Sequence, residues 1–200
     1  MAANSDISQI LKGIENRYNH AKTLRAGFSE TYALPGRTPR TESGELFLRK
    51  PGKMRWQYTD PAGKLFISDG KFIYSYTPDT NRAEKSKVKE TQDMRLPLAF
   101  LLGRLDFKKD FREFDAKPQG QDTFITALPK SNDLQYQKVG FLVAPDFQIR
   151  RLIVTGQDHS VLEFTFTGET INPPVNDAMF KFVPPPGAEY VDQTAEEGQQ

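Results

Sequence analysis

Apolar residues near the start of the chain recur every three or four positions, which places them on one side of a helix. Asp6 with Gln9 has the spacing of a capping box, and Asn4 or Ser5 is an alternative cap. The sequence therefore predicts an amphipathic helix over about residues 5–24, with its apolar side against a sheet. That side consists of Ile7, Ile10, Leu11, Ile14, Tyr18, Ala21 and Leu24.

After Gly27 the apolar pattern changes to a period of two, which is typical of strands. Short alternating runs follow one another, separated by turns rich in Gly, Pro, Asp and Asn, and this predicts consecutive antiparallel hairpins. The dipeptide Asp69-Gly70 fits the centre of a type I′ turn. The predicted strands cover residues 28–32, 45–49, 54–58, 64–68, 71–76, 82–89, 110–114, 123–128, 136–143, 149–154 and 161–167, with a last short strand at 180–182.

Between the two series of strands, the apolar run 96–102 predicts a short central helix, with Pro97 in its first turn and Gly103 as its C-cap. The predicted fold is α+β, in a single domain over residues 1–200. About 5–192 are ordered and 193–200 form a disordered polar tail. An antiparallel sheet of about ten or eleven strands tends to curl. Two helices on one face of it would cover an apolar cavity suited to a lipid, although an ordinary α+β core has the same pattern.

Large side chains gather on single faces of three predicted strands. Many are aromatic, and several have a polar group, as on surfaces that are apolar yet contact water. The alternative is plain core packing, which we expect for more than half of these positions. The three sets are Met54, Trp56 and Tyr58; Phe72, Tyr74 and Tyr76; and Leu162, Phe164 and Phe166.

The composition adds mainly exclusions. The 200 residues include 27 Lys and Arg against 26 Asp and Glu, and this net charge of +1 argues against a dedicated nucleic-acid binder. The absence of cysteine excludes disulfides, thiol nucleophiles and cysteine-bound metals. His20 and His159 stand in no catalytic motif. We therefore expect no catalytic residues, no metal site, no cofactor and no enzyme activity.

Two groups of basic residues lie on predicted strands. Lys85, Lys87 and Lys89 alternate along one strand, where they would protect an exposed edge from strand addition. Residues 49–55 bring Arg49, Lys50, Lys53 and Arg55 together around a turn. This group is either an anion-binding surface, for a headgroup or a partner, or an ordinary solvated hairpin.

An ordered set of segments resembles the bacterial periplasmic outer-membrane lipoprotein carriers, the LolA family. The first is Lys50-Pro51-Gly52-Lys53-Met54-Arg55-Trp56-Gln57-Tyr58, which follows Gly44. The hairpin Ser68-Asp69-Gly70-Lys71, the run 96–102 and residues 126–130 come next. The close is Phe180-Lys181-Phe182-Val183-Pro184-Pro185-Pro186-Gly187. The resemblance covers about residues 5–192.

The resemblance implies a strongly curved antiparallel half-barrel, with helices as a lid over an apolar cavity. It implies a periplasmic carrier that accepts triacylated lipoproteins from an inner-membrane ABC lipoprotein-releasing complex and delivers them to an outer-membrane lipoprotein receptor. Such a carrier is a monomer without a cofactor, hydrolyses nothing, and has lost its signal peptide.

The residues expected to bind the acyl chains lie on both sheet and helices. The family has an arginine where Lys50 precedes Pro51, and the role of that residue in lid closure and transfer falls to Lys50. Arg49 cannot replace it, because adjacent strand residues point to opposite faces. The expected lining of the cavity and lid is Met54, Trp56, Tyr58, Phe72, Tyr74, Tyr76, Leu98, Leu101, Leu102, Ile10 and Ile14.

Three other functions stay open at this point. A receptor of the same fold would carry a lipidated N-terminal cysteine, and this sequence has none. A binding module for another amphiphile, such as a glycolipid or a quinone, would need the same apolar surface. An enzyme would need a catalytic constellation that the motifs do not provide.

Overall fold

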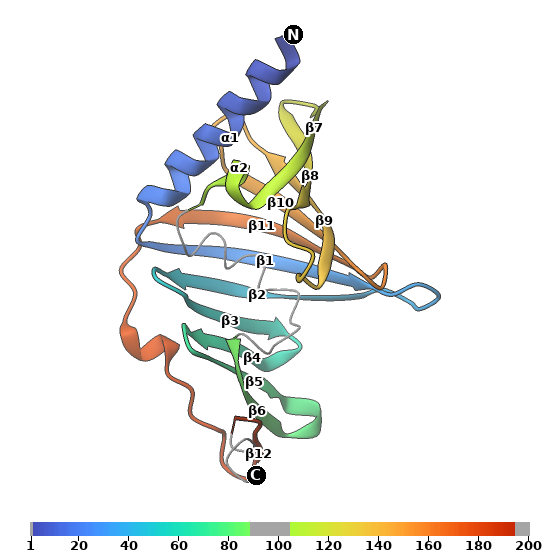
Figure 1. Ribbon diagram of the computed structural model, residues 1–200. Coiled ribbons are helices and arrows are strands. Elements are labelled where there is room, and N and C mark those ends of the chain that lie inside the picture. Colours follow the sequence, from blue (N-terminus) through green and yellow to red (C-terminus); the bar gives the residue numbers. More distant parts are fainter. Residues whose placement is uncertain (1, 89–104, 195–200) are drawn as a thin grey trace. The chain divides into compact units, whose positions relative to one another are not determined.

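The computed structural model describes residues 2–88 and 105–194, with side chains from Asp6 onward (Figure 1). The helices are α1 (Ala2–His20) and α2 (Phe107–Asp110), and the 3-10 helices are η1 (Pro78–Thr80) and η4 (Asp177–Phe180). The strands are β1 (Thr23–Ala33), β2 (Arg40–Arg49), β3 (Lys53–Asp60), β4 (Ala62–Asp69), β5 (Phe72–Thr77), β6 (Arg82–Lys87), β7 (Phe111–Gln119), β8 (Asp122–Pro129), β9 (Tyr136–Val143), β10 (Ile149–Gly156), β11 (Val161–Ile171) and β12 (Glu189–Asp192).

The described residues form two compact units. Unit one contains residues 2–21, 29–41 and 105–167, and unit two contains residues 22–28, 42–88 and 168–194. Strands β1, β2 and β11 each contribute residues to both units. The predicted mostly antiparallel open sheet with few helices is confirmed, whereas a single domain with helices over an apolar cavity stays a prediction.

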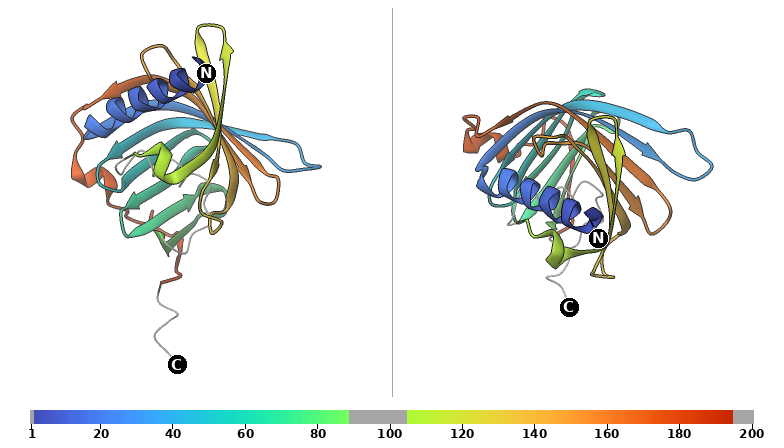
Figure 2. Two further views of the ribbon diagram at one scale, coloured as in Figure 1. Left: turned by 45° about the horizontal axis from the view of Figure 1, so that its top comes forward. Right: turned by 90° about the horizontal axis from the view of Figure 1, so that it is seen from above.

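Unit two is built from successive hairpins that lie side by side in the order β2-β3-β4-β5-β6-β12 (Figure 2). Every neighbouring pair is antiparallel except β12 with β6, which is parallel. The loop between β4 and β5 is Gly70-Lys71, and only Gly70 has a positive φ, of 97°. The predicted type I′ turn centred on Asp69-Gly70 is therefore wrong, because that turn needs positive φ at both central residues. Instead, the Asp69 carboxylate accepts the N–H groups of Lys71 and Phe72, each at 2.8 Å.

Unit one combines α1 with strands in the order β11-β10-β9-β8-β7, all antiparallel. Three polar contacts fix α1 in this unit. The buried Tyr18 hydroxyl accepts the Ile149 N–H at 2.9 Å, and the Glu15 carboxylate accepts the Phe107 N–H at 2.9 Å. The Asn19 amide exchanges two hydrogen bonds with the backbone of Leu105, at 2.7 and 2.9 Å. Helix α1 is thus held by its polar side as well as by its apolar side.

The predicted helix over 5–24 ends too late, because α1 stops at His20 and β1 begins at Thr23. Leu24, Ala26 and Phe28 are all buried, and they alternate with less buried residues. The period of two thus starts at Leu24, whereas the sequence pattern predicts that it starts after Gly27. The strand ladder takes up Leu24 because burying its side chain there also satisfies its backbone groups.

Other differences lie near the C-terminus and in the middle of the chain. The predicted strand at 180–182 is wrong, because η4 ends at Phe180, and the last strand is β12 instead. Gln193, expected in the tail, donates its N–H to the Lys85 carbonyl at 3.0 Å. The predicted helix at 96–102 lies outside the described residues, and so do 195–200. No helix among the described residues is long and apolar enough to cross a membrane.

The Tyr18 hydroxyl gives a test of how α1 is anchored. Replacing Tyr18 by Phe leaves the buried Ile149 N–H without its acceptor, which costs about 1–3 kcal/mol of unfolding free energy. Urea denaturation measures this loss. The matched control is Tyr32→Phe, at a residue that is 36% exposed, and we expect almost no change there. Equal stabilities of Tyr18→Phe and the wild type would contradict the assigned hydrogen bond.

Candidate functional site

One face of the sheet in unit two is mostly apolar on β2, β3 and the adjoining part of β4, and it continues with Ser75, Glu84 and Ser86 on β5 and β6. The strand register aligns Leu46 with Trp56 and Trp56 with Phe66, and next to them Leu48 with Met54. These side chains are 0–3% exposed. We call this surface the apolar face, and its members are Phe28, Leu46, Leu48, Met54, Trp56, Tyr58, Phe66 and Ile73. Three of the residues predicted to bind acyl chains, Met54, Trp56 and Tyr58, thus share one surface.

Three aromatic rings form the centre of the apolar face. Phe28 and Trp56 meet edge to face at a centroid distance of 4.8 Å and an angle of 73°, and Phe28 and Tyr58 do so at 5.1 Å and 84°. Such edge-to-face contacts hold rings in defined positions. Met54, two residues before Trp56 on β3 and on the same face, has an unbranched side chain that adapts to irregular partners. Rigid rings beside a flexible thioether suit the binding of flexible hydrocarbon chains.

Phe72, Tyr74 and Tyr76 lie on the opposite face of the same sheet. Tyr74 is aligned with Ile67, and Ile67 with Arg55, whereas Phe66 of the apolar face is aligned with Ser75. The prediction that these three residues line one cavity with Trp56 does not agree with this register. A two-residue hairpin loop pairs even-numbered residues of one strand with odd-numbered residues of the next. Applied to β4 and β5, this rule predicts from the sequence that Phe72, Tyr74 and Tyr76 lie on the face opposite Phe66.

These opposite-face aromatics have local partners. Tyr74 stacks on Phe182 at 5.4 Å, and the Lys85 ammonium lies 4.4 Å from the centre of the Phe72 ring. The Tyr76 hydroxyl donates to the Asn81 side chain at 3.0 Å. Burial, with the nearby Asp69 carboxylate, raises the pKa of the Tyr74 hydroxyl. Each ring thus has a structural contact within unit two.

The basic residues of β2 and β3 hold the segment 172–180, which we call the C-terminal strap. Arg49 donates to the Val175 carbonyl at 3.0 Å, and Arg55 donates to the Met179 carbonyl at 2.9 Å. The Asp177 carboxylate pairs with Lys53 at 3.0 Å and with Arg49 at 3.2 Å. The sequence alone allows two interpretations of this group, an anion-binding surface or a solvated hairpin. In the structure, these three cations bind the protein's own chain.

Lys50 follows β2 and donates its backbone N–H to the Lys22 carbonyl at 2.9 Å. Its side chain is half-buried, and this burial lowers the pKa of the ammonium group. Its role as a latch stays a prediction. The lid residues Leu98, Leu101 and Leu102 lie outside the described residues.

Unit one has an apolar face of its own. On α1, Ile14 is fully buried and Ile10 is half-buried. Sequence reasoning identified only Leu162, Phe164 and Phe166 in the sheet of this unit, although alternation around Leu152 and Phe141 was also visible. The residues that the register and burial place on this face are Ile125, Ala127, Val139, Phe141, Leu152, Val154, Leu162 and Phe164.

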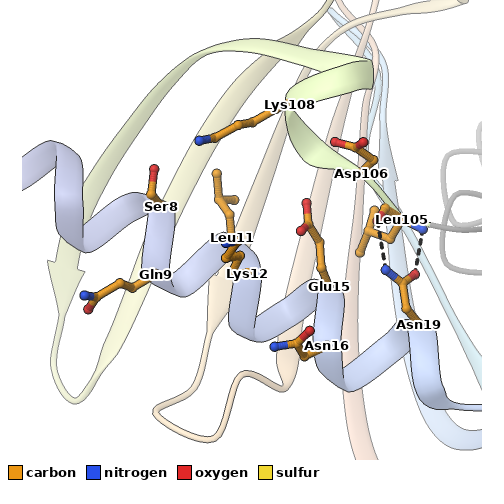
Figure 3. Close-up of a pocket in the computed structure, with 10 residues that line it drawn as sticks. All are labelled: Ser8, Gln9, Leu11, Lys12, Glu15, Asn16, Asn19, Leu105, Asp106 and Lys108. Atoms are coloured by element: carbon orange, nitrogen blue, oxygen red, sulfur yellow. Dashed lines mark hydrogen bonds between the residues drawn. The ribbon is translucent and has the colours of Figure 1, made fainter.

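A groove of about 530 Å³ runs along α1 in unit one, facing Leu105 and α2 (Figure 3). Its lining is mostly polar, and Glu15 and Asn19 already bond the backbone on the far side. Such a lining does not suit hydrocarbon chains. The groove contains none of the residues predicted to bind them. Across residues 2–88 and 105–194, no group of three or more His, Cys, Asp or Glu side chains is placed to hold a metal ion.

The ion pairs of the strap predict a defined response to pH. A hydrogen bond from Lys53, with the charge of Arg49, lowers the pKa of Asp177 in the folded protein. The carboxylate therefore contributes stability above its unfolded pKa of about 3.9, and this contribution is lost as the pH falls through the lower, folded value. We expect Asp177→Asn to unfold at lower urea than the wild type at neutral pH.

The difference between Asp177→Asn and the wild type should disappear in acid, as urea titrations over a range of pH will measure. Asp60→Asn is the control, since Asp60 is an exposed carboxylate at the end of β3. A difference that stays constant down to the lowest pH would show that the charge of Asp177 is not what holds the strap.

Comparison with known proteins places the chain in a family. The family model described as outer membrane lipoprotein carrier protein LolA matches residues 19–183. The outer-membrane lipoprotein carrier protein of Dechloromonas aromatica (strain RCB) is 30% identical over 185 residues, which cover 87% of this chain and 83% of that protein. The protein of the same name from Proteus mirabilis (strain HI4320) is 28% identical over 181 residues, covering 90% and 87%.

A solved structure supports the fold alone. An uncharacterized conserved protein from Thermus thermophilus has a TM-score of 0.55 and 12% sequence identity, over 94% of this chain and 99% of that one. The family model, in contrast, matches by sequence over most of the chain. The chain, with its apolar face, therefore belongs to the LolA family of outer membrane lipoprotein carrier proteins.

Proposed function

We propose that this chain is a periplasmic carrier that binds the acyl chains of lipoproteins released from the inner membrane and delivers them to the outer membrane. The observation that carries this proposal is the apolar face of unit two, in a chain whose relatives are named as outer-membrane lipoprotein carriers. The face has the chemistry that an acyl chain requires. The reaction is one of binding and release, with no bond made or broken by the carrier.

The full architecture is part of the proposal. The sheet forms a curved half-barrel in a single domain, and the helices, with Ile10, Ile14, Leu98, Leu101 and Leu102, form a lid over an apolar cavity. Lys50 acts as the latch of that lid. The partners are triacylated lipoproteins, an inner-membrane ABC lipoprotein-releasing complex and an outer-membrane receptor, and the carrier acts as a monomer.

The energetics of release set a limit on the binding site. Burial is worth about 0.8 kcal/mol for each CH₂ group, so one chain of about 16 carbons contributes roughly 12 kcal/mol. Complete burial of three chains would exceed the practical affinity limit of about 18–21 kcal/mol. A carrier must bind more weakly than complete burial allows. A site lined by Trp56, Tyr58 and Met54 meets this requirement, because it offers both polar edges and an adaptable side chain.

The function is tested by release of lipoprotein from membranes. Vesicles that contain the releasing complex, ATP and a radiolabelled lipoprotein are incubated with the purified chain, and label in the supernatant is counted. We expect soluble label with the wild type, and several-fold less with Met54→Gln, which places an amide on the apolar face. Gln57→Met, the converse change at an exposed position of the same strand, is the control. No soluble label with the folded wild-type chain would overturn the carrier function.

Trp56, the only tryptophan of the chain, reports directly on the binding surface. Bromine atoms on an acyl chain quench tryptophan fluorescence on contact, so brominated chains should quench Trp56 and unbrominated ones should not. The control is the double variant Trp56→Phe with Tyr74→Trp, which moves the only tryptophan to the opposite face. Equal quenching at both positions would show that the acyl chains do not choose the apolar face.

A further inference from the structure

Two charged side chains stand at one end of the apolar face, beside the hairpin between β3 and β4. Lys64 pairs with the carboxylate of Glu42, and its ammonium lies 4.5 Å from the centre of the Tyr58 ring. The two side chains are shielded from water, at 20% exposure for Lys64 and 12% for Glu42. Both belong to unit two, as Tyr58 does.

A side-chain contact places Lys64 at the apolar face. The register of β3 with β4 aligns Phe66 with Trp56 but shifts between Gln57 and Thr59, so strand alternation does not by itself orient Lys64. The contact of its ammonium with the ring of Tyr58, a member of the apolar face, gives its position. The apolar face therefore has a direction: it starts at a cation beside Tyr58 and continues past Trp56 to Met54 and Leu48.

Stability alone is a weak explanation for an ion pair at this position. Shielding two charges from water costs free energy that their attraction often only balances, and apolar residues of similar volume are commonly as stable or more so. A function is the better explanation. A lysine ammonium has three N–H donors, and among the described residues Glu42 is the one acceptor that the structure assigns to it. Lys64 thus retains donors for an oxygen atom that arrives with a ligand.

We propose, building on the carrier function, that Lys64 binds the ester carbonyl oxygens at the head of the acylated cargo. Glu42 and the Tyr58 ring hold the ammonium in place for this contact. The chains then run along the apolar face from Tyr58 toward Met54, with their methyl ends farthest from Lys64. The ligand class is a diacylglyceryl ester, as distinct from any hydrocarbon of the same length.

The direction of the chains is tested with tryptophan at the two ends of β3. Positions 58 and 54 are about 13 Å apart, at about 3.3 Å for each strand residue. In a Trp56→Phe background, Tyr58→Trp and Met54→Trp each provide a single reporter. The probes are diacylglycerols brominated either near the carbonyl groups or near the methyl ends. We expect the first probe to quench position 58 more, and the second to quench position 54 more.

The opposite pattern would overturn the proposal, and it would place the ester groups at the end of the face near Lys50. Quenching at neither position by either probe, with both variants folded, would instead contradict the carrier function. The two failures are therefore distinguishable.

The contact itself is tested by Lys64→Met, which replaces the side chain by an unbranched one that is a single heavy atom shorter and removes its charge. Affinity is measured by quenching of Trp56 with two probes, a brominated diacylglycerol and a brominated alkane of the same chain length. Hydrogen bonds to charged groups predict a loss of affinity on the order of tenfold for the diacylglycerol. The affinity for the alkane should stay unchanged. A merely structural effect of the substitution would instead lower the affinity for both probes.

Lys71→Met is the matched control, because Lys71 is an exposed lysine in the loop between β4 and β5. We expect it to bind both probes as the wild type does. An equal loss for both probes in Lys64→Met, or no loss for either, would overturn the proposed ester contact.

Discussion

The alternation of side chains along β3, fixed by hydrogen bonding to β2 and β4, is the constraint on which the apolar face depends. Because the pleat has a period of two, Met54, Trp56 and Tyr58 are buried together, while Arg55 turns to the opposite side. One strand thus supplies both an apolar surface and a row of cations. A shift of register by one residue would exchange the two sides and bury the charges.

The sequence predicted the order and type of nearly all elements, because hydrophobic period and turn residues act locally. The wrong predictions lie where contacts between distant parts of the chain determine the structure. Leu24 continues the helical spacing, yet its backbone pairs in β1. Phe72, Tyr74 and Tyr76 share a face as predicted, but the loop between β4 and β5 determines which face that is. The strap around Asp177 depends on contacts more than 120 residues apart in sequence, which no local pattern reveals.

The candidate site was therefore predictable in part. The shared face of Met54, Trp56 and Tyr58 on β3 is predictable, because large apolar residues at alternate positions are a strong signal of a buried strand face. The ion pair of Lys64 and Glu42 is not, because neither charge is unusual in a strand until the fold places it beside Tyr58. For a lipid carrier such a placement matters as much as the apolar area. Apolar area determines how tightly the acyl chains bind, whereas a charge at one end of the face determines how the ester that carries them is oriented.

The C-terminal strap has a consequence for how this family can vary. Arg49 and Arg55 bind the strap through the carbonyl oxygens of Val175 and Met179, so they recognise the path of the backbone and not the side chains. Substitution at positions 175 and 179 leaves those oxygens in place. Related sequences should therefore drift freely at these two positions while they retain the two arginines. Asp177, which contributes its own carboxylate, should change only together with Lys53 or Arg49.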